Sequence, residues 1–137
     1  MGKLFFNTRD ELVVVDTERI AVIQASGNYS RLVYINKREL MLTLGITRVE
    51  EAMANVKNKN HKLIRLGRSL IINHSFLQKI DLLRQQIVLS DGTNEIRVNA
   101  SKRMLKAYKD AVMKSIKIKN NGKANIPGNG GNTAVQD

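Results

Sequence analysis

Short apolar runs separated by polar turns fill most of the chain between residues 11 and 98. The runs are rich in β-branched residues, and their lengths are typical of strands rather than of helices. Asp91-Gly92 is a typical hairpin turn signal, and Asn36-Lys37 separates two further runs. We therefore predict strands over residues 12–15, 20–23, 29–35, 40–44, 63–66, 70–72, 77–83, 86–89 and 95–98.

Two segments have the residue spacing of helices instead. Thr47–Glu50 has the capping-box pattern, which predicts a helix start, and a second apolar periodicity runs from about residue 101 to residue 114. The predicted fold class is therefore mainly β with two short helices. The apolar face of the first helix would comprise Val49, Met53 and Val56, and that of the second Leu105, Tyr108 and Val112.

The end of the chain has a different composition. Residues 120–137 contain the only proline, Pro127, together with five asparagines and a run of glycines. Such a segment has little apolar surface to bury, so ordering it would cost backbone entropy without compensation. We assign one folded domain to residues 1–116 and a flexible Gly/Asn-rich tail to residues 117–137.

The balance of charges indicates a polyanionic partner. The chain has 23 Lys and Arg against 12 Asp and Glu, a net charge of +11, and two stretches, residues 52–80 and 96–109, contain basic residues but no acidic one. Lys and Arg contacts to phosphates supply most of the non-specific affinity for DNA. Aromatic residues, on which single strands stack, are only 4 % of the chain, so duplex DNA is favoured. A membrane surface is not, because neither predicted helix sets Trp or Phe opposite a basic face.

The sequence gives little support for a catalytic site or a metal site. The chain has no cysteine, and His61 and His74 lack nearby carboxylates at ligand spacing. Ser69, His74 and Asp81 could form a triad only by a chance arrangement. We therefore expect no catalytic residue, no cofactor and no metal. The absence of a secretory signal and of a long apolar run predicts a soluble cytoplasmic protein.

Three polar positions stand out as candidates for reading DNA, because no helix-turn-helix pair can be drawn. Asn28 and Tyr29 lie in a loop beside Gly27, where the backbone is free to turn. Arg68 lies in a second corner, beside a glycine and between two apolar runs. The third position is the start of the last helix, residues 102–103, where free N–H groups favour phosphate.

The segments around these positions resemble the LytTR DNA-binding family, the output domain of LytR/AlgR-type bacterial response regulators. The resemblance lies in residues 23–29, 63–73, 89–92 and 96–98 and covers roughly residues 10–112. It implies an elongated fold of antiparallel β-sheets with few helices. It also implies that loops dock into successive major grooves of promoter DNA, with some bending.

The resemblance also suggests which residues contact DNA. Asn28 and Tyr29 match the first contact loop, Arg68 the second, and Ser101–Arg103 the third segment. The candidate DNA-binding residues are Asn28, Tyr29, Arg65, Arg68, Ser69, Asn73, Ser101, Lys102 and Arg103.

Two departures from the family pattern affect these assignments. Gly67 stands where the family often has His before the Arg-Ser pair, so any contact of that His is lost or replaced. The third segment differs from the usual Val-Ser-Arg, and the choice between Lys102 and Arg103 for its contact stays open. Only nine residues precede the resemblance, too few for a phosphoreceiver domain, so we expect a stand-alone domain.

The sequence therefore predicts a transcription regulator that binds double-stranded promoter DNA sequence-specifically. Two alternatives share the positive charge: a small RNA-binding β protein, and a protein-interaction module derived from a DNA-binding domain. The sequence leaves open whether the chain binds as a dimer or as paired copies on adjacent half-sites. The promoter, the direction of regulation and the input signal do not follow from it.

We expect duplex binding to weaken steeply with salt. Basic residues in the two acid-free stretches offer several phosphate contacts, and each should add about −0.9 to the slope of log K against log salt. Fluorescence anisotropy of a labelled duplex at increasing salt measures this slope. A slope near zero would rule out an electrostatic DNA footprint.

Overall fold

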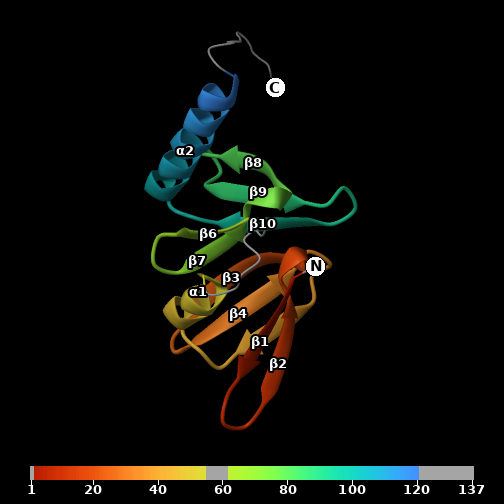
Figure 1. The fold of residues 1–137 in the computed structure, drawn as a ribbon. Helices are drawn as coiled ribbons and strands as arrows, with labels where there is room; N and C mark the ends of the chain where they lie inside the picture. The colour runs from red at the N-terminus through yellow and green to blue at the C-terminus, as the bar shows by residue number, and fades with distance from the viewer. Residues whose placement is uncertain (1, 55–61, 121–137) are drawn as a thin grey trace.

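The computed structural model describes residues 2–54 and 62–120, with side chains up to residue 116. Within these ranges, ten strands form three antiparallel sheets, and two α-helices accompany them. The sheets are stacked along one long axis, with the first hairpin at one end and the last helix at the other (Figure 1). The predicted fold class, mainly β with elongated antiparallel sheets and two helices, is confirmed.

A five-stranded sheet occupies the middle of the molecule, and its strand order is β5-β4-β3-β7-β6. Every predicted strand in this region is present, with boundaries shifted by a few residues at most. The strands span Ile20–Ser26 (β3), Tyr29–Tyr34 (β4), Glu39–Leu42 (β5), Leu63–Leu66 (β6) and Leu70–Asn73 (β7).

Both faces of this central sheet are covered, which explains why its inner strands are apolar without interruption. All four residues of β7 are buried. Within β7, the adjacent residues Ile71 and Ile72 point to opposite faces of the sheet, because successive side chains of a strand alternate. Ile71 belongs to one apolar core and Ile72 to the other. A run of apolar residues in this chain therefore indicates a strand packed on two sides.

One face is covered by the hairpin of β1 (Lys3–Asn7) and β2 (Leu12–Asp16) together with helix α1 (Ile46–Ala54). Strand β1 is not among the strands predicted from the sequence. Its alternation is regular, since Leu4 and Phe6 are buried while Lys3, Phe5 and Asn7 are exposed. Phe5 lies on the outer face and is 60 % exposed.

The other face is covered by β8 (Leu77–Asp81), β9 (Gln86–Ser90), β10 (Glu95–Asn99) and helix α2 (Lys102–Asn120). The predicted Asp-Gly turn joins β9 to β10. The Asp91 carboxylate accepts hydrogen bonds from the backbone N–H groups of Asn94 and Thr93, which lower the pKa of Asp91. Two short 3₁₀ turns that the sequence did not signal, Thr17–Arg19 and His74–Phe76, complete the chain path.

Both helices differ from the prediction at one end. Helix α1 begins at Ile46, and the Gly45 carbonyl accepts from the N–H groups of residues 48 and 49, so the capping box at Thr47 is wrong. The Glu50 carboxylate of that motif binds Arg65 instead. Helix α2 continues to Asn120, past the predicted end near residue 114. Most of the predicted tail, residues 121–137, and also Val56 lie outside the described residues.

Asn73 connects the end of β7 to the start of β3. Its Nδ2 donates to the Ile20 carbonyl at 2.8 Å, and its Oδ1 accepts from the backbone N–H and the hydroxyl of Ser75. The side chain is only 2 % exposed. Asn73 therefore completes the hydrogen bonding of a buried backbone carbonyl and caps the following 3₁₀ turn.

We predict that Asn73→Ala lowers the free energy of unfolding by about 1–3 kcal/mol, since the Ile20 carbonyl would lose its partner inside the protein. The exposed Asn28→Ala serves as a matched control and should change stability by less than about 0.5 kcal/mol. Urea unfolding of the two variants and the parent measures both changes. Equal effects would contradict a structural role for Asn73.

Candidate nucleic-acid interface

The β3–β4 turn presents two of the candidate residues. Ser26 pairs with Tyr29, leaving a two-residue turn of Gly27 and Asn28. Gly27 has a φ of 63°, the left-handed region that the first position of a type II′ hairpin turn requires. Asn28 is exposed, and Tyr29 is 51 % exposed. The turn therefore projects an amide and a phenol into solvent.

The β6–β7 turn presents Arg68 and Ser69. Leu66 pairs with Leu70, so the turn consists of three residues beginning at Gly67, whose φ is 65°. A Cβ at this glycine would lie 2.7 Å from the Cε of Met104. Gly67 thus allows both the turn conformation and the close approach of helix α2.

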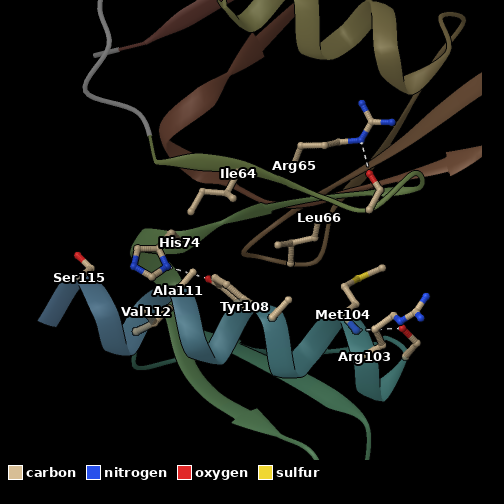
Figure 2. A pocket seen from close by; sticks show the side chains of 13 residues that line it. Ile64, Arg65, Leu66, His74, Arg103, Met104, Tyr108, Ala111, Val112 and Ser115 are labelled. Atoms are coloured by element: carbon tan, nitrogen blue, oxygen red, sulfur yellow. Dashed lines mark hydrogen bonds between the residues drawn. The ribbon is translucent and has the colours of Figure 1, made fainter. Parts of the chain in front are cut away.

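Arg65, which is partly buried, fixes the shape of this turn. Its Nε donates to the Gly67 carbonyl at 2.9 Å and its Nη2 to the Arg68 carbonyl at 2.8 Å, and its Nη1 lies 2.6 Å from Glu50 Oε1 (Figure 2 shows the bond to residue 67). A planar guanidinium can make these bonds together because its donors form a rigid fork. Arg65 therefore acts as a positioning residue for Arg68.

These two turns leave the sheet at the same edge. In the register of β3 and β7, Gln24 is opposite Leu70. The Ala25 N–H donates to the Ser69 carbonyl at 2.9 Å, which extends the pairing up to the turn itself. The β3–β4 and β6–β7 turns are consequently neighbours, although they are some forty residues apart in the sequence.

The start of α2 is the third segment at this edge. The Ser101 hydroxyl accepts from the Met104 N–H at 3.2 Å, and the Ser101 carbonyl accepts from the Leu105 N–H at 3.0 Å. Ser101 is thus the N-cap, as the prediction of a helix start there requires. Lys102 and Arg103 are exposed in the first turn, where the helix dipole favours an anion.

A hollow of about 420 Å³, which we call the edge hollow, lies between the second and third segments. Ser101 and Ser69 both line it, so the second and third candidate segments lie side by side. Gln24 and Ala25 of β3, the strand that leads into the first turn, form part of its wall. The edge hollow is lined by Gln24, Ala25, Ser69, Leu70, Asn99, Ala100, Ser101 and Met104.

Seven of the nine candidate residues are exposed around this hollow or on the adjoining turns, and we call this set the loop edge. It contains no acidic side chain. The other two candidates are placed elsewhere: Asn73 is buried, and the Arg65 guanidinium is occupied by the β6–β7 turn and Glu50. The loop edge comprises Asn28, Tyr29, Arg68, Ser69, Ser101, Lys102 and Arg103.

Gln24 is a polar residue of the hollow that was not among the candidates. Its Oε1 accepts from Arg31 Nη1 at 2.6 Å, which fixes the orientation of the amide. Arg31 is itself held by two bonds to the Glu39 carboxylate, and the hydrogen bond from Arg31 lowers the pKa of Glu39. The sequence feature that could have pointed to Gln24 is its position as a single polar residue within the apolar run of β3.

The described residues do not assemble the triad considered from the sequence. His74 Nδ1 lies 2.7 Å from the Tyr108 hydroxyl, and Asp81 is engaged by Arg84 and Lys79. Burial raises the pKa of Tyr108 to about 12, and burial followed by the charge of Lys62 lowers the pKa of His74. Both groups are therefore uncharged at neutral pH.

The described ranges show neither a metal-site cluster nor a membrane-spanning helix. Within residues 2–54 and 62–120, no three His, Cys, Asp or Glu side chains gather as a metal site would require. Over the same ranges, neither helix combines the length and apolar character that crossing a membrane demands.

The sequence matches the profile of the LytTr DNA-binding domain over residues 10–113. This match covers most of the chain and includes all three segments of the loop edge. The chain belongs to the LytTR DNA-binding domain family. LytTR domains bind DNA, so DNA is the partner that membership implies, and the family is not one of enzymes.

A solved structure has the same fold. It is the LytTr DNA-binding domain of a Bacillus cereus protein described as a methyl-accepting/DNA response regulator. The TM-score is 0.53 at 15 % sequence identity, and the alignment covers 82 % of this chain and 97 % of that one. A search of curated proteins found no match.

We expect the effects of substituting Arg65 and Glu50 on the free energy of unfolding to be coupled. Arg65→Ala should lower the free energy of unfolding by about 1–3 kcal/mol, since two turn carbonyls and a carboxylate lose a charged donor. Glu50→Ala should cost less, within the range of about 0–1 kcal/mol for a partly exposed pair. Urea unfolding of both single variants and the double variant forms a complete cycle. Strictly additive effects would show that the pair contributes nothing.

Proposed function

We propose that this LytTR domain binds duplex DNA sequence-specifically, inserts its loop edge into the major groove, and regulates transcription from promoters in the bacterial cytoplasm. The observation that carries the proposal is the convergence of three exposed polar segments, from distant parts of the chain, on one edge. Sequence is read through base edges, whereas phosphate contacts set the position of the protein.

Arg68 is the residue to which we assign base reading. Among the described residues, its guanidinium has no hydrogen-bond or ion-pair partner, and the carbonyls of its own turn are already bonded to Arg65. An arginine that projects freely from a fixed turn can form a bidentate pair with guanine O6 and N7. Its conformational cost on binding is reduced because the backbone is held in place beforehand.

The neighbouring segments supply complementary contacts. Asn28 can pair with adenine through its amide, in the bidentate geometry typical of Asn. At the start of α2, Lys102 and Arg103 place two cations beside free backbone N–H groups, an arrangement suited to a phosphate. Gln24 offers its amide nitrogen in the edge hollow, because its oxygen is held by Arg31.

A gel shift that compares duplex DNA, single-stranded DNA and duplex RNA tests the nucleic-acid class. Selection from random duplexes then identifies the preferred site and shows whether one or two copies bind. Preference for either RNA or a single strand would favour the RNA-binding alternative, for which the exposed Tyr29 offers a stacking ring. Failure to bind all three nucleic acids would favour the protein-interaction alternative.

We predict that Arg68→Lys loses specificity while keeping charge. Lysine lacks the planar fork, so affinity for the selected site should fall by about 1–3 kcal/mol, whereas affinity for unrelated DNA should hardly change. Arg38→Lys is a matched control, since Arg38 is exposed after the far end of β4, away from the loop edge. Fluorescence anisotropy with both duplexes, alongside thermal melting, measures these effects.

The ratio of the two affinities decides the outcome. An unchanged ratio in Arg68→Lys would exclude base reading by this residue. A lowered melting temperature with both affinities reduced together would instead assign Arg68 to the stability of the turn.

A further inference from the structure

A second concave surface lies beside the loop edge, between strand β6 and helix α2. This helix groove has a volume of about 740 Å³ (Figure 2). The volume is within the range of small-molecule sites, and most of the lining is apolar. Its apolar walls include Ile64, Leu66, Met104, Tyr108, Ala111 and Val112.

The charges around the helix groove select the class of ligand. None of its lining residues is acidic. Arg103 stands at one end and, among the described residues, has no ion-pair partner. At the other end lies His74, whose ring is bonded to the Tyr108 hydroxyl and whose pKa is lowered first by burial and then by the charge of Lys62. A cationic ligand would be repelled by Arg103, whereas an anionic group would be attracted to it.

The groove is long as well as apolar. The α2 residues that line it run from Arg103 to Ser115, which corresponds to about 18 Å along the helix at 1.5 Å per residue. An extended acyl chain can follow such a wall and leave its head group near the guanidinium. We propose that the helix groove binds a free amphipathic carboxylate, a medium-chain fatty acid, and that this ligand weakens DNA binding.

Two residues connect the helix groove to the loop edge. Ser101 and Met104 line both the groove and the edge hollow. Met104 also lies against Gly67, the first residue of the turn that carries Arg68. A ligand that displaces Met104 therefore acts on that turn, and its carboxylate neutralises Arg103. The effect on DNA rests on the proposed function, whereas binding of the ligand does not.

Isothermal titration calorimetry of the full chain with decanoate tests the ligand site. Decyltrimethylammonium is the matched probe, with the same chain length and the opposite charge. We expect saturable one-to-one binding of decanoate, at least tenfold tighter than binding of the cation. Equal affinity for the two probes would overturn the assignment of an anionic ligand.

Two substitutions locate the site. Ala107→Trp places a large ring in the groove and should weaken decanoate binding at least tenfold, whereas Met113→Trp, on α2 but outside the groove lining, should not. Thermal melting confirms that both variants fold. If Ala107→Trp does not fold, Arg103→Gln provides the test, since it should remove the preference for decanoate over the cation. Unchanged binding in the folded groove variant, or an unchanged preference in Arg103→Gln, would overturn the proposal.

Other occupants give different results. Binding to phosphatidylglycerol vesicles without binding of monomeric decanoate would assign the groove to a membrane surface. Self-association that Ala107→Trp abolishes would assign it to a second copy of the chain. Either result overturns a free carboxylate ligand.

The coupling to DNA has its own measurement. Saturating decanoate should reduce duplex affinity at least threefold in the parent and leave Ala107→Trp unaffected. If the protein binds decanoate and DNA independently, the coupling is wrong while the ligand site stands. If it binds decanoate but no DNA, the proposed function fails and the ligand site again stands.

Discussion

The central five-stranded sheet is buried on both faces, and the rest of the structure depends on this constraint. Strand β7 has no exposed residue, and its side chains alternate between two separate cores. A sheet packed on both sides cannot shift register without moving apolar groups into the wrong core. The positions at which β3 and β7 end are therefore fixed, and so is the place where their turns meet.

The turn that carries Arg68 is held from both sides of that sheet. On one side, Glu50 of helix α1 anchors Arg65, which binds the turn carbonyls. On the other side, Met104 of helix α2 lies against Gly67. Each covering layer thus contributes one contact to the same three-residue turn. A glycine at position 67 is compatible with this arrangement. Any larger residue would be strained at the positive φ, and its Cβ would clash with the Met104 side chain.

The sequence predicted the strands well because each is a short apolar run bounded by turn residues. It could not show side-chain direction within the family-like segment at residues 63–73. Arg65 and Asn73 were therefore grouped with Arg68, although the Arg65 guanidinium is bonded to the turn and Asn73 is buried. The β1 strand was missed because its alternation involves only two buried residues, Leu4 and Phe6, which suffice for a strand only once β2 pairs with them. Helix α1 starts at Ile46, where the Gly45 carbonyl accepts from the N–H groups of residues 48 and 49, and the Glu50 carboxylate of the predicted capping box binds Arg65, a tertiary contact that local patterns do not include.

The distribution of ion pairs decides where the net positive charge can act. Arg97 is paired with Glu95, Arg31 with Glu39, and Asp81 lies near both Arg84 and Lys79. Among the described residues, none of the ion pairs includes Arg68, Lys102 or Arg103. The field at the loop edge is therefore not cancelled locally, although cations elsewhere on the surface also stay unpaired. Charge alone would then attract DNA to several faces, whereas the loop edge adds the exposed amide of Asn28 and the edge hollow to its cations. Shape and hydrogen-bonding groups, rather than charge, discriminate among base pairs, and for this reason the proposed function assigns base reading to the loop edge.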